Sequence, residues 1–106
     1  MIQVGTYFIV NADNLPRLTD LHLCGLCPLT CGLSIRATVT ASSISDDGFI
    51  YCLQRSILNV NGEEISPQEF KVFWQNKPDE IFPHLELVTL LLLLNISSET
   101  ISKLLF

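Results

Sequence analysis

Charged residues are scarce in this sequence of 106 residues, of which 16% are Asp, Glu, Lys or Arg. Because a soluble monomer usually carries about a quarter of its residues as charged side chains, the deficit indicates that a partner or a second copy covers part of the surface. Basic runs are also missing, because the six Lys and Arg residues are scattered singly along the chain, and they are outnumbered by 11 acidic residues. Nucleic-acid binding relies on a basic patch that neutralises phosphates, so it is disfavoured here.

Long apolar runs and targeting signals are lacking as well. The longest apolar run extends from Val88 to Leu94, broken only by Thr89, and is far shorter than the roughly 20 residues that span a bilayer. No positively charged region precedes the apolar N-terminal stretch, which Asp13 soon interrupts, so no secretory signal is predicted. We therefore expect no membrane association and a cytoplasmic location, where thiols stay reduced.

Residue patterns that carry catalysis are lacking too. The five glycines are too dispersed to form a phosphate-binding loop. His22 and His84 lie beside leucine and proline, with no carboxylate adjacent to either in the sequence. The sequence thus predicts no catalytic residue and favours a protein that is not an enzyme, while a site assembled between subunits stays open.

The chain does contain a clear β pattern. From Ser34 to Ser42, apolar and polar residues alternate strictly, which is typical of a strand with one buried face. The turn formers Asp46-Asp47-Gly48 follow, and Phe49 to Val60 is interpreted as the returning strand of a hairpin. β-branched and aromatic residues from Ile2 to Val10 predict a first strand, and Glu63 to Ile65 a short edge strand.

A helix is predicted where the chain changes character, at Ser66-Pro67-Gln68-Glu69. This segment is a capping box with proline at the first helical position. Phe70, Phe73 and Trp74 follow at helical spacing, and the helix should end before Pro78.

Two further helices are predicted at the C-terminal end. Leu85 to Leu94 is apolar nearly all round, which favours a buried helix over the alternative of a buried strand. Ser97 or Ser98 then caps a last short helix that carries Ile101, Leu104 and Leu105.

Together these elements predict a single domain over residues 1–106 of the α+β class. Its antiparallel sheet has three to four strands, followed by two to three C-terminal helices. The expected core has Ile35, Val39, Phe70, Phe73 and Trp74 at its centre, with Leu87, Leu90, Leu91 and Leu94 packed on them.

Three of the four cysteines lie within eight residues, at Cys24, Cys27 and Cys31, in the irregular stretch from Leu15 to Gly32 that is interpreted as a partly buried loop. With Cys52 they could bind Zn²⁺ as tetrahedral thiolates, and His22 is a substitute ligand. Zinc is therefore the one cofactor that the sequence suggests. In the alternative interpretation the cysteines are reduced and pack as small hydrophobic residues.

The segment from residue 94 to residue 104 resembles the turn and recognition helix of bacterial helix-turn-helix domains, with apolar residues at the matching positions Leu94, Ile96, Ile101 and Leu104. The resemblance implies DNA binding by the last helix. The segment departs from the motif at Leu91, where the motif has a small residue, and the helix offers one base, Lys103.

A second resemblance concerns the middle of the chain. The stretch from Cys31 to Arg36 is similar to the His-Gly-His stretch of pyruvoyl-tetrahydropterin synthases, and Asp47-Gly48-Phe49-Ile50 to the turn before their next strand. Both zinc histidines of that stretch are replaced here, by Cys31 and Leu33. The resemblance thus implies a relative without the metal chemistry of that family.

The leading hypothesis rests on the leucine-rich C-terminal region. Burying one leucine contributes roughly 1.5–3 kcal/mol, so leaving a run of leucines in water is costly. We expect a small non-enzymatic module that binds protein, as a homo-oligomer or as a subunit of a larger assembly, through Leu90, Leu91, Leu92 and Leu93. The alternatives are a zinc-binding domain that uses the four cysteines and a DNA-binding domain of the helix-turn-helix type.

Overall fold

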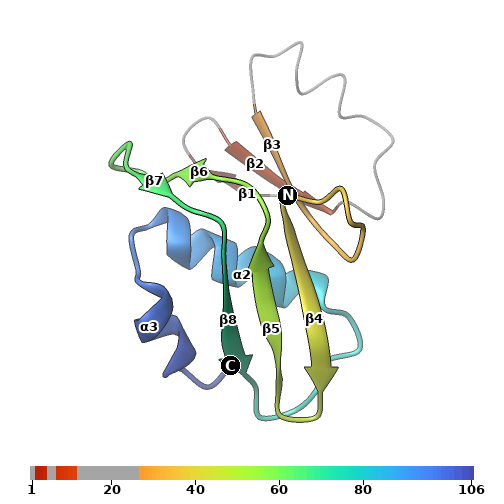
Figure 1. The fold of residues 1–106 in the computed structure, drawn as a ribbon. Coiled ribbons are helices and arrows are strands. Elements are labelled where there is room, and N and C mark those ends of the chain that lie inside the picture. Colours follow the sequence, from red (N-terminus) through yellow and green to blue (C-terminus); the bar gives the residue numbers. More distant parts are fainter. Residues whose placement is uncertain (1, 5–6, 12–26) are drawn as a thin grey trace.

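A computed structural model describes residues 2–4, 7–11 and 27–106 (Figure 1). Its elements, in chain order, are β1 (Ile2–Val4), β2 (Tyr7–Asn11), β3 (Cys27–Cys31), β4 (Val39–Ser45), β5 (Gly48–Leu53), β6 (Ile57–Leu58), β7 (Glu64–Ile65), β8 (Gln68–Phe73), α2 (Phe82–Leu93) and α3 (Ser98–Ser102). The described strands come first in the chain and the two helices follow them, in agreement with the predicted α+β class.

The main sheet has the strand order β1-β2-β3-β4-β5-β8 among the described residues. The ladders β1–β2, β4–β5 and β5–β8 are antiparallel, whereas β3 pairs in parallel with both β2 and β4. The sheet is therefore mixed, and the prediction of a purely antiparallel sheet of three to four strands is wrong. The source of the error is β3, which lies in the stretch interpreted as a loop and joins the two antiparallel parts.

The predicted hairpin is present as β4 and β5, but it begins later than the alternating pattern does. Residues 32–38 form a loop, which is held by the Gly32 N–H donating to the Val39 carbonyl at 3.0 Å. The Gln54 side chain donates to the Ala37 carbonyl at 2.7 Å. Ile35 is consequently 90% exposed on this loop and is not part of the core as predicted, because its backbone is committed to the loop rather than to the sheet.

The predicted helix after Ser66 is instead the strand β8. Each residue from Gln68 to Phe73 pairs antiparallel with a residue of β5, so β5 provides the ladder hydrogen bonds that a helix would have made internally. Alternation then places Val72 in the core and turns Phe73 outward, where it is 38% exposed. Long-range pairing therefore overrides the local capping signal.

Trp74 and Phe70 each pack against an aromatic ring of β5. The Trp74 ring lies 5.1 Å from the ring of Phe49, and the ring of the partly buried Phe70 lies 4.9 Å from that of Tyr51. Such aromatic pairs stabilise a core beyond the area that they bury. Trp74 is 2% exposed and confirms its predicted place in the core.

Both C-terminal helices are confirmed, and the segment from Leu85 to Leu94 is helical rather than extended. Pro83 stands in the first turn of α2, where proline is favoured, and Ser97 caps α3 by accepting a hydrogen bond from the Thr100 N–H. After α3 the chain returns to the edge of β8, where the Phe106 N–H donates to the Phe73 carbonyl at 2.9 Å. The last residues thus cover part of that edge.

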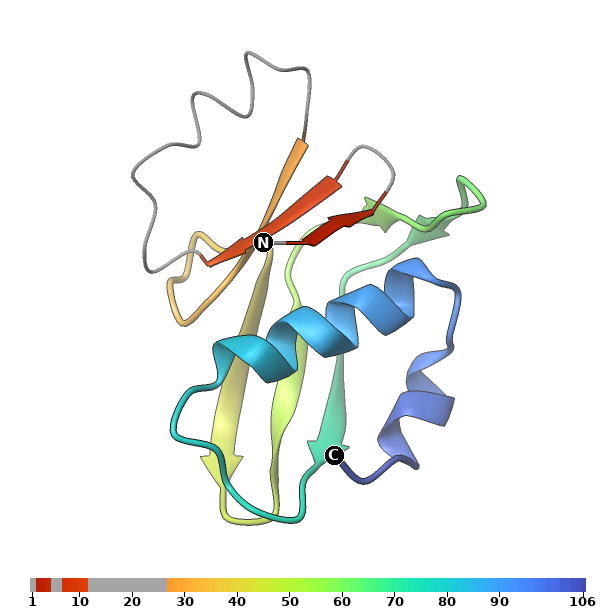
Figure 2. The same cartoon turned by 180° about the vertical axis from the view of Figure 1, so that it is seen from behind.

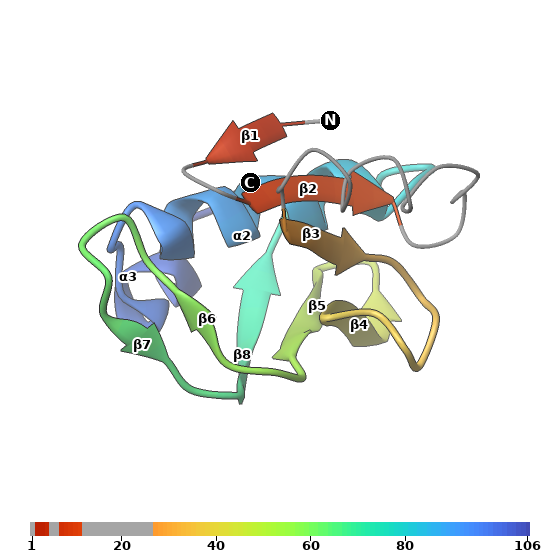
Figure 3. The ribbon, with the colours of Figure 1, turned by 90° about the horizontal axis from the view of Figure 1, so that it is seen from above.

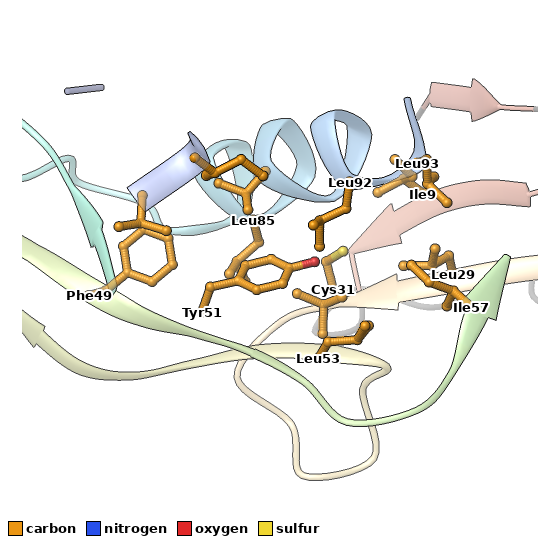
Figure 4. Packing of buried hydrophobic residues seen from close by; sticks show 14 of the residues in the cluster. Ile9, Leu29, Cys31, Phe49, Tyr51, Leu53, Ile57, Leu85, Leu92 and Leu93 are labelled. Carbon is orange, nitrogen blue, oxygen red and sulfur yellow. The ribbon is translucent and has the colours of Figure 1, made fainter. Parts of the chain in front are cut away.

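The core lies between the sheet and α2, which crosses the back of the strands (Figures 2 and 4). It is built from apolar side chains of β2, β3, β4, β5, β8 and α2, together with Ile57 and Ile101. Val39 is fully buried as predicted, whereas Leu87 and Leu94 are 41% and 49% exposed and are not core residues. Viewed from above, α2 lies on one side of β4, β5 and β8, and no described element covers their other side (Figure 3).

Candidate functional site

The two sides of α2 differ in what they contact. Its buried residues, Leu85, Val88, Thr89, Leu92 and Leu93, face the sheet. Since successive helical residues are rotated by about 100°, the opposite side of the helix carries the residues at i, i+4, i+7 and i+11 from the first turn. These are Pro83, Leu87, Leu90 and Leu94, which we call the α2 stripe.

The α2 stripe is apolar throughout and open to solvent. Pro83, Leu87 and Leu94 are exposed and Leu90 is half-buried. Glu86 is the one charged residue between Phe82 and Leu94, and it is not a member of the stripe. Figure 2 shows no described element in front of the helix on this side. A surface helix normally turns polar residues to water, so this face has the composition of an interface.

The structure divides the four predicted interface leucines between the two sides of α2. Leu92 and Leu93 are 3% and 1% exposed and pack in the protein's own core, whereas Leu90 and Leu91 are half-buried. Leu87 and Leu94, which were assigned to the core, lie on the open side instead. The helical spacing of Pro83, Leu87, Leu90 and Leu94 is the signal that could have identified the stripe.

Beneath α2 lies a buried polar cluster formed by Thr89, Tyr51 and Cys31, all with no exposed surface. The Thr89 hydroxyl donates to the Leu85 carbonyl at 2.7 Å. The Thr89 Oγ1 also lies 2.7 Å from the Tyr51 hydroxyl and 3.7 Å from the Cys31 Sγ. Because the single hydroxyl hydrogen of Thr89 is committed to Leu85, Tyr51 and Cys31 must both donate to Thr89. Figure 4 shows the Tyr51 hydroxyl next to the Cys31 sulfur.

Burial keeps this cluster uncharged. Burial raises the pKa of the Cys31 thiol to about 12, against a smaller lowering by its hydrogen bond with Thr89 and with a further increase from the charge of Glu86. The pKa of Tyr51 is likewise raised, chiefly by burial. Metal binding and nucleophilic attack both require the thiolate, which is the disfavoured form of Cys31 here. The arrangement therefore supports packing rather than catalysis.

The structure does not bring the predicted zinc ligands Cys31 and Cys52 together. Cys31 faces α2 with Tyr51, and because neighbouring residues of a strand point to opposite faces, Cys52 points away from α2. Its Sγ lies 3.6 Å from the Ser42 hydroxyl on that other face. Among the described residues no group of three or more His, Cys, Asp and Glu side chains is placed to hold a metal ion. Cys24 and His22 lie outside the described residues, and of Cys27 only the backbone is described.

His84 stands in the first turn of α2 in an aromatic environment. Its ring meets those of Trp74 and Phe106 edge-on, at centroid distances of 5.3 and 6.4 Å. The Nδ1 atom is buried, with no hydrogen-bond partner among the described residues. Burial lowers the pKa of His84, so the neutral ring is favoured.

The segment that resembles a recognition helix, α3, is five residues long and packs against the edge of β8. Ile101 is fully buried, and the Ser102 hydroxyl donates to the Lys71 carbonyl at 2.7 Å. In that part of the chain which the structure describes, no helix has the length and hydropathy of a membrane span. Comparison of the chain with protein-family models, with curated proteins and with solved structures found no match.

Proposed function

We propose that this protein is a small interaction module, not an enzyme, that self-associates through the α2 stripe. The observation that carries the proposal is that Leu87 and Leu94 are exposed on the outward side of α2, where all four stripe residues are apolar. The inward face of the same helix anchors it to the sheet, and half-buried Leu90 also packs against the edge of the core, so Leu87 and Leu94 are the stripe leucines left to face solvent.

The spacing of the stripe favours a second copy as the partner. The intervals between its members are four, three and four residues, which is the heptad spacing of packed helix pairs. In an antiparallel pair related by a two-fold axis, Leu87 of one copy lies opposite Leu90 of the other, and Pro83 lies opposite Leu94. All four positions are then in register at once, and no like charges meet along the seam. A two-fold interface of this kind closes on itself and yields a dimer.

The expected dimer is weak, because α2 is short. Its 12 residues span about 18 Å, so we take the apolar area buried by two stripes as about 500 Å². At about 25 cal/mol per Å² this contributes roughly 12 kcal/mol, against an association cost of roughly 4–15 kcal/mol. With a cost of about 6 kcal/mol, within that range, the net of about −6 kcal/mol corresponds to a dissociation constant on the order of 10–100 µM.

Analytical ultracentrifugation tests the proposal with a matched pair of variants. Leu87 and Leu104 are 41% and 42% exposed, but Leu104 lies after α3 and outside the stripe. The wild-type chain and the Leu104→Glu variant should rise from the monomer mass of 11.9 kDa toward twice that mass as the concentration passes about 100 µM. The Leu87→Glu variant should stay monomeric, with unchanged circular dichroism.

Two results would contradict the proposal. One is a wild-type chain that remains monomeric up to about 1 mM. The other is a folded Leu87→Glu variant that dimerises as well as the wild type does.

A further inference from the structure

Among the residues that the structure describes, strand β4 has an open edge over most of its length. On one side it pairs with β5, but on the other side the described part of the chain gives it one pair with β3, Cys31 with Val39. The Gln54 N–H donates to the Thr38 carbonyl, just before the first pair of the β4–β5 ladder. Since hydrogen-bonded and non-hydrogen-bonded pairs alternate from there, Thr40 and Cys52 form a hydrogen-bonded pair, and the N–H and carbonyl of Thr40 point toward β5. By alternation, the N–H and the carbonyl of Ala41 point away from β5. No described residue provides a hydrogen-bond partner for these two groups of Ala41.

A pocket lies beside this edge. Its volume is about 340 Å³, and its apolar wall includes Ile44 of β4, Trp74 and Ile81. Leu33, from the loop that joins β3 to β4, also lines it, which places the pocket on the β3 side of β4. The segment before α2 passes beside the lower end of β4 and forms the far wall (Figure 1).

The chemistry of the pocket limits what can occupy it. Lys77 and Asp79 stand at the pocket with opposite charges, so the pocket favours no net charge in its occupant. The volume is at the lower end of the range for ligand sites, about 300–1,000 Å³, and suits one or two apolar side chains. The Trp74 indole N–H donates to the carbonyls of Ser45 and Asp46 at 3.1 and 3.0 Å, so that its ring is held as a fixed wall.

We propose that the open edge of β4 binds an extended peptide segment of a partner protein, with an apolar side chain in this pocket. An unpaired backbone N–H and carbonyl side by side are matched by the backbone of another strand. Strand addition at a sheet edge combines such backbone bonds with a pocket for alternate side chains, and both elements are present here.

The occupant is a flexible segment rather than β4 of a second copy. The β4–β5 ladder shifts register between Ser42 and Ser45, and Ser43 has a φ of 50°, so the strand leaves its straight course directly after Ser42. A bulge of this kind limits pairing between β4 of one copy and β4 of another. A flexible peptide can follow the bend, whereas a folded strand cannot.

Trp74 is the only tryptophan of the chain, so its fluorescence reports on the pocket directly. The probe is the blocked peptide Ac-SVLVS-NH2, titrated together with nitrogen-15 amide spectra. A second peptide, N-methylated at its three central residues, keeps the side chains but removes the backbone donors. The protein variants are Ile44→Asp in the pocket wall and Ile35→Asp as the control, since Ile35 is 90% exposed and does not line the pocket.

We expect a saturable change of Trp74 fluorescence and a shift of the Ala41 amide signal. N-methylation of the peptide and Ile44→Asp should each weaken binding by at least about tenfold, and Ile35→Asp should leave it unchanged. The Leu87→Glu variant should bind the peptide normally, which separates this site from the α2 stripe.

Three outcomes would overturn the proposal. The first is the absence of any saturable change up to about 5 mM peptide. The second is equal binding of the methylated peptide, which would identify a pocket for apolar groups rather than a strand site. The third is a shift of the Ala41 signal with protein concentration alone, which would assign the edge to a second copy.

Discussion

Removal of the Thr89 hydroxyl should destabilise the protein in a way that depends on Tyr51. Thr89 Oγ1 donates to the Leu85 carbonyl and accepts from the Tyr51 hydroxyl, both at 2.7 Å. Thr89→Val removes this acceptor and leaves the Tyr51 hydroxyl, which has no exposed surface, without a partner. Tyr51→Phe removes the donor instead, and Thr89 keeps its bond to Leu85.

The two single variants should therefore lose different amounts of stability. A buried hydroxyl without a partner costs roughly 1–3 kcal/mol, and a satisfied hydrogen bond contributes a net of roughly 0.5–1.5 kcal/mol. Thr89→Val loses the bond and strands the hydroxyl, so we expect a loss of about 2–3 kcal/mol in the free energy of unfolding. Tyr51→Phe should lose about 1 kcal/mol. In the double variant the stranded hydroxyl is gone, so the combined loss should be about 1 kcal/mol smaller than the sum.

Urea unfolding of the wild type, the two single variants and the double variant measures this coupling. Tyr7→Phe is the control, because the Tyr7 hydroxyl accepts from the Leu58 N–H at an exposed site. It should combine additively with Thr89→Val, within about 0.5 kcal/mol. Additive losses for Tyr51→Phe and Thr89→Val, or a Thr89→Val variant as stable as the wild type, would refute the assignment of hydrogen-bond donors in the cluster.

Four further outcomes follow from single residues. Gly48→Ala should destabilise the protein by roughly 1–3 kcal/mol or more in urea unfolding, because a Cβ there would overlap the Val72 carbonyl oxygen. Ser97→Ala should cost about 1 kcal/mol in the same assay, through loss of the α3 cap. The raised pKa of Cys31 contributes stability that is present below pH 9.0 and lost as the pH rises toward about 12, so unfolding free energies of Cys31→Ala should fall less steeply over that range than those of the wild type. Because the pKa of His84 is lowered, its contribution is present above pH 6.5 and lost below it, and an NMR titration of the ring should give a midpoint under 6.5.

Local signals predicted the parts of the fold that depend on neighbours in the chain. The β4–β5 hairpin, the helix at Leu85 to Leu94 and the cap at Ser97 all depend on contacts within a few residues. β8 was mistaken for a helix because its ladder partners in β5 lie from 15 residues (Leu53 with Gln68) to 25 residues (Gly48 with Phe73) away in the chain and leave no mark in the local pattern. Ile35 was misplaced for a related reason, since the alternation continues into a loop that the distant Gln54 side chain holds in place.

The candidate site was predicted in part. The low content of charged residues indicated a surface that a partner covers, and the leucine run indicated that this surface lies in the C-terminal region. The run alone does not say which of its leucines face the sheet. That assignment depends on the phase of α2, which is set by the core residues Leu85 and Val88. The open edge of β4 could not be predicted, because it exists only where β3 diverges after one pair with Val39.

The two proposed surfaces lie on different parts of the molecule, and this has a consequence for binding. The stripe residues lie on the side of α2 opposite its buried residues. The edge of β4, by contrast, is free where β3 diverges from it (Figures 1 and 2). If both proposals hold, we expect a dimer formed through α2 to leave both β4 edges open and to carry two peptide sites in a fixed geometry. A partner chain with two matching segments would then bind the dimer more tightly than the Leu87→Glu monomer, by up to about 100-fold, provided that its linker spans the two sites. Equal affinity of both proteins for such a two-segment peptide, at concentrations where the wild type is dimeric, would show that the two sites do not act together.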